Sequence, residues 1–184
     1  VDTHWDIGMH DYTAIWLTQS LPGGRVNVID FYQNQGEGLP HYVRTLHEKG
    51  HVYGTHYGPH DLEVREMGTG KSRREAAYNL GLNFRVVPRL PVEDGIHASR
   101  LLIPRCYFDR DLCRDGLEAL RHYHRAYSEK TRQFRDQPVH DWSSHAADAF
   151  RTAAIGLQTQ RLNNGTPPQR DAEMAYNPYE YGAA

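Results

Sequence analysis

The sequence has few cysteines and few lysines, and it contains no long hydrophobic run. Its 184 residues include only two cysteines, Cys106 and Cys113, whose spacing matches no common zinc pattern and cannot form a disulfide framework. A mean hydropathy of -0.75 excludes a membrane span, whereas 39% hydrophobic residues exclude wholesale disorder. We therefore expect a folded protein of the reducing cytosol that is not secreted.

Lysine is scarce even among the basic residues. Of 21 basic side chains only three are lysines, and the others are arginines, which favour bidentate contact with phosphate or carboxylate. A formal net charge of -2 argues against an indiscriminately basic nucleic-acid binder. The 12 histidines can include metal ligands or proton carriers, but their number does not choose between these roles.

The chain length fits one domain and excludes two full ones. Residues 1–160 contain the periodic segments, and we expect them to form this domain. Residues 161–184 have no hydrophobic period, which predicts a flexible C-terminal tail. Because the sequence opens inside a strand-like alternation without an initiator Met, we expect it to be part of a longer protein with a further N-terminal domain.

Hydrophobic periodicity predicts an α/β fold with a mixed central sheet flanked by helices. The first eight residues alternate as a half-buried strand, and strands at 13–20 and 25–33 follow, joined by a hairpin. A helix from Leu39 ends at Gly50, and a fourth strand at 51–57 is expected beside the first. The remaining expected elements are a helix at 72–80, a strand at 84–88, helices at 92–102 and 111–123, a hairpin around 127–134, and a helix from Ser143 or Ser144 to about 158. The sheet would thus have three antiparallel strands followed by parallel additions.

The string Gly68-Thr69-Gly70-Lys71-Ser72 looks like the end of a phosphate-binding loop. The full pattern needs a glycine five residues before Gly70, where Arg65 stands. The preceding residues 62–67 are also charged and do not form the hydrophobic strand that such a loop follows. The sequence therefore argues against nucleotide binding by this mechanism and favours a mobile glycine-rich loop.

The predicted topology brings together three acidic residues. Asp6 lies on the first strand, Asp61 lies just after the fourth, and Asp148 lies in the first turn of the last helix. Hard divalent cations prefer oxygen ligands, and a pair of ions needs carboxylates between them. A metal site is one interpretation. The other is that the three are, respectively, a surface residue, a turn residue and a charge at a helix N-terminus.

Three motifs surround these acids. They are Trp5-Asp6-Ile7-Gly8 followed by Asp11-Tyr12-Thr13-Ala14-Ile15-Trp16, then Gly58-Pro59-His60-Asp61, and finally Ser144-His145-Ala146-Ala147-Asp148-Ala149-Phe150-Arg151. No single motif suffices. Their order and spacing over residues 1 to about 158 resemble the nuclease domain of a tailed-bacteriophage DNA-packaging terminase large subunit.

The resemblance implies a ribonuclease H-like fold that binds two Mg²⁺ or Mn²⁺ ions and hydrolyses phosphodiester bonds in double-stranded DNA. The family's first, second and third acids map onto Asp6, Asp61 and Asp148. Asp141 precedes the same helix, and either it or Asp148 could face the metal ions. Further candidates for the site are His145, His60 and Asp11.

The resemblance also implies a biological setting. The enzyme would be an endonuclease that cuts a concatemeric viral genome at the start and end of packaging. Its expected partners are double-stranded DNA, an N-terminal packaging ATPase domain in the full-length chain, the portal and the small terminase subunit, but no membrane. Its expected location is the host cell cytoplasm and, transiently, the portal vertex of the procapsid.

Two basic groups are candidates for DNA contact, because phosphate contacts supply most of the affinity of such proteins. The preferred group is Lys71, Arg73 and Arg74, just after the Asp61 loop, and the second choice, on the expected hairpin, is Lys130, Arg132 and Arg135. A solvated charged surface is the alternative for both groups. His4 shares a strand face with Asp6 and could orient a ligand or move a proton.

Two other functions remain open at this point. One is a junction-resolving nuclease of the same fold, with similar acids and a four-way junction as substrate. The other is a non-catalytic DNA-binding or portal-docking module whose acids hold a structural ion. Metal-dependent nicking of a supercoiled plasmid separates the second from the nucleases.

Overall fold

The computed structural model describes residues 1–8, 11–65 and 70–163 of the chain. A six-stranded sheet forms its centre, in the order β5-β4-β1-β2-β3-β6. Its strands are β1 (Asp2–Asp6), β2 (Tyr12–Ser20), β3 (Val26–Gln35), β4 (His56–Gly58), β5 (Phe84–Val86) and β6 (Cys106–Phe108). β1, β2 and β3 are antiparallel, whereas β4, β5 and β6 are added in parallel, so the predicted mixed α/β sheet is confirmed.

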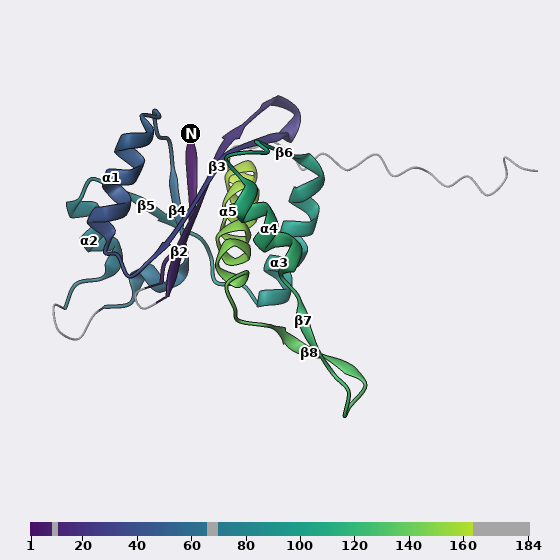
Figure 1. The fold of residues 1–184 in the computed structure, drawn as a ribbon. Coiled ribbons are helices and arrows are strands. Elements are labelled where there is room, and N and C mark those ends of the chain that lie inside the picture. The colour runs from purple at the N-terminus through teal and green to yellow at the C-terminus, as the bar shows by residue number, and fades with distance from the viewer. Residues whose placement is uncertain (9–10, 66–69, 164–184) are drawn as a thin grey trace, which may run out of the picture.

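Helices cover both faces of the sheet (Figure 1). α1 (Leu39–Lys49) and α2 (Arg73–Asn79) lie on one face. α3 (Val92–Leu102), α4 (Arg114–His122) and α5 (Ser144–Asn163) lie on the other. Three short 3-10 helices connect strands and helices: η1 (Pro22–Gly24), η2 (His60–Glu63) and η3 (Ile103–Arg105). Within the described residues, no helix is long and apolar enough to cross a membrane.

Each face of the sheet has its own hydrophobic core. Successive residues of a strand point to opposite faces, so Trp5 and Ile15 pack toward α1 while Trp16 packs toward α5. Trp16 Nε1 donates a hydrogen bond of 2.8 Å to the Ala146 carbonyl, which fixes the start of α5 over β2. At Gly116 in α4, an added Cβ would lie 2.7 Å from Phe31 Cγ, so glycine permits the close approach of this helix.

The central strand β1 is covered on both faces, whereas its alternation predicted a half-exposed strand. His4 is completely buried, donates or accepts a 2.8 Å hydrogen bond with Thr18 Oγ1, and stacks on Tyr57. Strands in the middle of a sheet between two helical layers need not expose either face. The polar residue at position 4 therefore belongs to the core.

Two strands depart most from the sequence-based expectation, one in its extent and one in its existence. The strand expected at 51–57 is reduced to β4, because the Asp2 carboxylate takes the Thr55 amide hydrogen bond, at 2.8 Å, in place of a backbone carbonyl. The short strand β6 was not predicted, because it has only three residues and exists through its parallel pairing with β3.

The hairpin expected around 127–134 forms a separate two-stranded sheet of β7 (Arg125–Ser128) and β8 (Gln133–Pro138). It extends away from the helical layers (Figure 1). At the other end of the sequence, α5 continues to Asn163, beyond the expected start of the tail at 161. Residues 164–184 lie outside the described part of the chain.

Candidate active site

The candidate site lies where β1 and β4 end. These two strands are parallel, with Thr3 opposite His56 and His4 opposite Tyr57, so their carboxyl ends meet at the same edge of the sheet. Asp6 is the last residue of β1, and Pro59 directs the chain after β4 into η2, which carries Asp61. Open α/β sheets place functional groups at such an edge.

Helix α5 adds the third acid. The helix packs across β1 and β2 and is held at its first turn by the hydrogen bond from Trp16. Its first two turns carry His145 and Asp148. The alanines and Phe150 of this helix face the core, so Asp148 reaches the site from the edge of the helix and keeps 28% of its side chain exposed.

Asp6 is repelled by each of the other two carboxylates, and burial disfavours the charged forms of Asp6 and Asp148. Burial raises the pKa of Asp6, and the neighbouring Asp61 carboxylate raises it further, while the hydrogen bond from His145 opposes both. Burial also raises the pKa of Asp148 to about 6, with Asp6 adding to the shift and Arg151 opposing it. The Arg151 guanidinium donates to Asp148 Oδ1 at 2.6 Å. Asp6 therefore interacts with both of the other acids.

Asp61 has one oxygen that is available for a ligand. Its Oδ2 lies 3.9 Å from Arg73 Nη1, a long ion pair. Its Oδ1 is buried and has no hydrogen-bond partner among the described residues. A buried carboxylate oxygen without a partner is energetically unfavourable unless a cation or a hydrogen-bond donor binds to it. The cluster of Asp6, Asp61 and Asp148, called here the carboxylate cluster, has the donor chemistry that suits a hard divalent cation.

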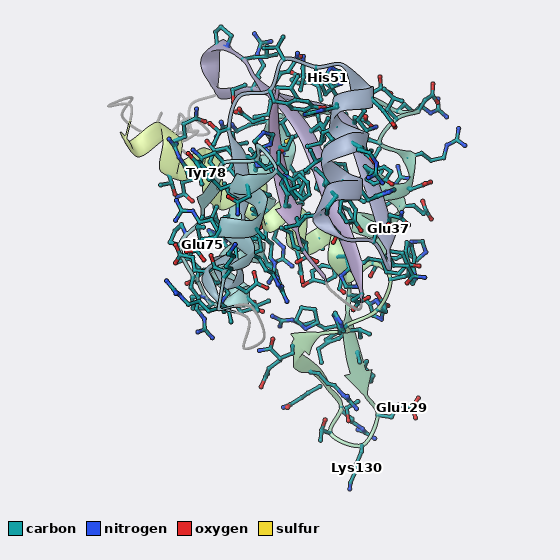
Figure 2. The ribbon with its side chains drawn as sticks, turned by 90° about the vertical axis from the view of Figure 1, so that its left-hand side faces the viewer. Glu37, His51, Glu75, Tyr78, Glu129 and Lys130 are labelled. Carbon is teal, nitrogen blue, oxygen red and sulfur yellow. The ribbon has the colours of Figure 1, made fainter. Side chains whose placement is uncertain are left out.

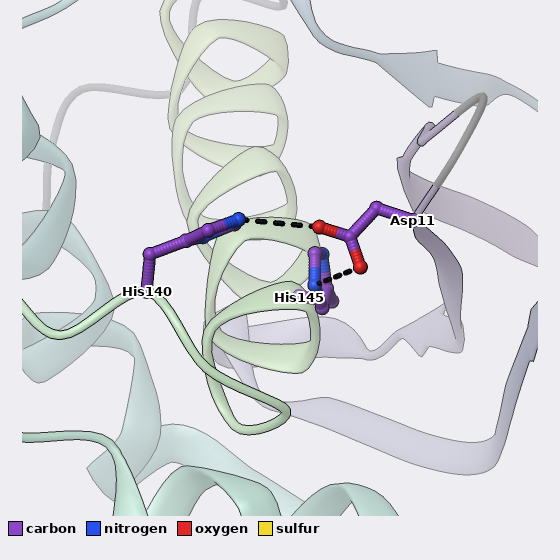
Figure 3. A group of neighbouring side chains, drawn as sticks. All are labelled: Asp11, His140 and His145. Carbon is purple, nitrogen blue, oxygen red and sulfur yellow. Dashed lines mark hydrogen bonds and ion pairs between the residues drawn. The ribbon is translucent and has the colours of Figure 1, made fainter.

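His145 connects the carboxylate cluster to Asp11. Its Nδ1 donates to Asp6 Oδ2 at 3.1 Å, and its Nε2 lies 3.0 Å from Asp11 Oδ1. The hydrogen bond to Asp6 raises the pKa of His145 above its ordinary value, although burial opposes this. A second histidine, His140, lies 3.2 Å from the other Asp11 oxygen (Figure 3).

His140 was missed by the sequence reasoning, whereas His145 and Asp11 were named. The signal that could have found it is its position in the segment that enters α5, directly before Asp141 and five residues before His145. Asp141 itself forms a turn, because its Oδ1 accepts from Ser143 N at 2.8 Å and from Ser143 Oγ at 2.6 Å. The Ser143 hydrogen bond lowers the pKa of Asp141. His60 is exposed in η2 beside Asp61.

The two predicted DNA-contact groups occupy different surroundings. Arg73 faces Asp61, and Arg74 Nη1 lies 3.1 Å from Glu63 Oε1, so both pair with acids. Lys71 and Arg73 line a hollow of about 450 Å³ between α1 and α2. In contrast, the hairpin carries exposed basic residues, with Lys130 at its tip pointing away from the body of the molecule (Figure 2). These hairpin residues are Lys130, Arg132 and Arg135.

Comparison with solved structures gives the same fold as the sequence resemblance implied. The P22 large terminase nuclease domain superposes with a TM-score of 0.64 at 16% identity, covering 85% of this chain and 80% of that one. The SPP1 large terminase nuclease domain with bound Mn superposes with a TM-score of 0.55 at 12% identity, covering 83% and 85%. The chain therefore has the ribonuclease H-like fold of large-terminase nuclease domains.

A longer protein aligns as well. The large terminase of the thermophilic bacteriophage D6E gives a TM-score of 0.63 at 17% identity over 85% of this chain. This chain spans 39% of the length of that terminase. No family model matches the sequence, and no curated protein matches it.

Proposed function

We propose that this chain is a metal-dependent nuclease domain of a phage large terminase that acts in genome packaging. The observation that carries the proposal is the buried Oδ1 of Asp61, which has no partner within residues 1–8, 11–65 and 70–163 and lies near Asp6, itself a neighbour of Asp148, at the sheet edge of a terminase-nuclease fold. The SPP1 nuclease domain, which has this fold, was solved with manganese bound. The acids of the carboxylate cluster would hold the divalent cations.

The residues present fit such ions. Asp6, Asp61 and Asp148 are hard oxygen donors, and bound cations would relieve the repulsion that Asp6 experiences from Asp61 and Asp148 from Asp6. The finer proposal is that two ions, Mg²⁺ or Mn²⁺, bind here. Held by Asp6, Asp61 and Asp148, such ions would supply activation of a water for attack on the scissile phosphodiester and stabilisation of the leaving oxygen.

The protein positions these acids through neighbouring side chains. His145 donates to Asp6 and restricts its rotation, so that one oxygen of Asp6 has a fixed direction. Arg151 does the same for Asp148 through its 2.6 Å hydrogen bond. His145 and Arg151 both lie on α5, within one turn of Asp148. The helix therefore holds these two side chains in fixed positions beside Asp6 and Asp148.

The substrate and setting follow from the proposed family. The substrate would be double-stranded DNA of a concatemeric viral genome, cut endonucleolytically. In the full-length protein a packaging ATPase domain would precede residues 1–160, and the portal and small terminase subunit would be partners. The protein would act in the host cell cytoplasm and, transiently, at the procapsid portal vertex. Residues 161–184 would form a tail outside the nuclease domain.

The decisive experiment is plasmid nicking by four acid variants in the presence of Mg²⁺ or Mn²⁺. Asp6→Asn, Asp61→Asn and Asp148→Asn each remove a negative ligand at nearly constant volume, and we expect cleavage to fall by about two orders of magnitude or more. Asp141→Asn should reduce cleavage less, because its carboxylate is engaged with Ser143.

The matched control is Asp115→Asn, an exposed acid on α4, which should cut like the wild type. All variants are compared at equal circular dichroism. Near wild-type cleavage by Asp6→Asn contradicts the nuclease proposal. If Asp141→Asn is inactive and Asp148→Asn is active, the third ligand is Asp141. Preferential cleavage of a four-way junction over linear duplex would favour a junction-resolving nuclease.

A further inference from the structure

Two histidines and one carboxylate converge beside the carboxylate cluster. Asp11, His140 and His145 each offer one ligand atom, and these atoms lie within 4.8 Å of one another. The three residues come from separate segments: Asp11 precedes β2, His140 belongs to the loop before α5, and His145 lies in the first turn of α5 (Figure 3). The fold, and not a local sequence motif, brings them together.

Both imidazole rings are oriented with the same nitrogen toward Asp11. The Nδ1 of His145 is taken by Asp6 Oδ2 at 3.1 Å, and the Nδ1 of His140 lies 3.0 Å from the hydroxyl of Ser144. Each Nε2 therefore faces one oxygen of Asp11, at 3.0 Å for His145 and 3.2 Å for His140. In metal sites, ligating histidines are oriented in this way by a carboxylate or another polar group at the second ring nitrogen.

The donor set indicates the class of ion. Imidazole nitrogen suits zinc and other first-row transition metals, whereas Mg²⁺ prefers oxygen ligands alone. Metal–ligand bonds of about 2.0–2.1 Å in a tetrahedral zinc site separate neighbouring ligand atoms by roughly 3.3 Å. The two rings approach different oxygens of Asp11, at 3.0 and 3.2 Å, and one ligand atom from each of the three residues lies within 4.8 Å of the others, so small side-chain rotations would bring the three atoms to this spacing.

The cluster is buried on one side and open to solvent on the other. The side chain of His145 is only 6% exposed and packs against the ring of Tyr12, with 5.6 Å between ring centroids. The side chains of Asp11 and His140 are 46% and 71% exposed. An ion can therefore enter from solvent, and water can complete its coordination.

We propose that Asp11, His140 and His145 form a second metal site that binds a transition-metal ion of the Zn²⁺ or Co²⁺ class, separate from the carboxylate cluster. The hydrogen bond from His145 to Asp6 connects the two sites. The inference goes beyond the proposed nuclease function and does not require catalytic activity. Without an ion, the same contacts are ion pairs between Asp11 and the two histidines, and titration with metal distinguishes the two cases.

The test is titration of the chelator-treated chain with Co²⁺, followed by visible absorption and calorimetry. The titration is run in excess Mg²⁺, which occupies the carboxylate cluster, and we expect one further site with the visible bands of a Co²⁺ ion bound to nitrogen and oxygen ligands, displaced by Zn²⁺. His140→Ala removes a ligand on an exposed loop and should weaken Co²⁺ binding by at least about tenfold. Asp11→Asn should weaken it as well.

Two further variants complete the design. His122→Ala removes an exposed histidine that pairs with Glu118 and should leave the Co²⁺ titration unchanged. Asp148→Asn removes an acid of the carboxylate cluster and should keep the Co²⁺ bands while losing cleavage, so the two proposals can fail separately. An unchanged titration in His140→Ala, or no visible bands in the wild type, overturns the second metal site.

Discussion

Burial shifts the titration of His4 and Asp148 in opposite directions. Burial disfavours the charged form of any group, so it lowers the pKa of His4 to about 3 and raises the pKa of Asp148 to about 6. His4 is therefore a neutral core residue held by Thr18 and Tyr57, not a proton carrier. For Asp148, a bound cation would favour the charged form and so lower this raised pKa again.

The first prediction concerns His4 and acid stability. The unfolded chain protonates this histidine below about pH 6.5, whereas the folded protein does not do so until about pH 3. The unfolded state thus binds more protons in this window, and stability is lost as the pH falls through it. Between pH 7 and pH 5, His4 should lower the free energy of unfolding by roughly 2 kcal/mol.

Urea unfolding at several pH values measures this contribution. His4→Gln keeps a hydrogen-bonding side chain near Thr18 but does not titrate, so its free energy of unfolding should fall less between pH 7 and pH 5 than that of the wild type. The difference between the two proteins isolates His4 from the other titrating groups. His122→Gln, at an exposed position, should retain the wild-type pH dependence, and an equal dependence in His4→Gln would contradict the prediction.

At the scale of secondary-structure elements, the hairpin and the α2 region differ as surfaces for DNA. Among the described residues, no ion pair involves Lys130, Arg132 or Arg135 of the hairpin, whereas Arg73 and Arg74 face Asp61 and Glu63. A cation that already has an acidic partner releases fewer counterions when it contacts a phosphate. The sequence favoured the group of Lys71, Arg73 and Arg74 over the hairpin group for DNA contact. A direct comparison of variants can test this order.

The second prediction compares these two groups. A hairpin variant combines Lys130→Ala, Arg132→Asn and Arg135→Ala, with asparagine at 132 because its φ is 52°. We expect it to weaken duplex binding and to reduce the salt slope by up to about three. Arg73→Ala with Arg74→Ala should weaken binding with little sequence preference, but by a smaller factor per charge.

Fluorescence anisotropy at several salt concentrations measures both effects. The charge-matched control replaces Arg110, Arg114 and Arg121, which line a hollow beside α4, by alanine. If this control loses as much affinity as the hairpin variant, net charge and not the position of the hairpin determines binding. Unchanged binding by the hairpin variant would make Arg73 and Arg74 the main DNA-contact group.

Elements with a clear hydrophobic period were predictable from the sequence. α3 has the predicted bounds Val92–Leu102, and α1 ends where expected, because Gly50 adopts a left-handed φ of 68°. The extents of β4 and β6 were not predictable, since each depends on a partner far away in the sequence. A three-residue strand has too few positions to show an alternation.

The proximity of Asp6 and Asp61 was predictable for a simple reason. The carboxyl ends of adjacent parallel strands meet, and this places Asp6 near Asp61 once the strand order is known. His140 was not predictable, because its contact with Asp11 depends on the path of a loop that no periodicity encodes. A histidine in a loop gives no signal until the fold places an acid opposite it.

At the scale of the whole molecule, stability and metal binding are linked. The sheet edge holds acids whose charged forms are disfavoured by burial and by one another, and this repulsion opposes folding at neutral pH. The unfolded chain separates these acids. A cation that binds only the folded state therefore stabilises the whole domain, and loss of one acid has two opposite consequences: less repulsion without metal and less stabilisation with it.

The third prediction is that Mg²⁺ raises the melting temperature of the wild type but not that of Asp61→Asn. Mg²⁺ is chosen because it prefers oxygen ligands and so reports on the carboxylate cluster and not on the site of Asp11, His140 and His145. At a hundredfold excess over Kd, binding adds about 2.7 kcal/mol to the free energy of unfolding. In a domain of this size that corresponds to a rise of roughly 5–10 °C.

Without metal, Asp61→Asn should melt no lower than the wild type, because a repelling charge is gone. Differential scanning calorimetry, with Asp115→Asn as the matched control, measures both effects. An equal rise in Asp61→Asn would show that Mg²⁺ stabilises the protein from elsewhere on its surface.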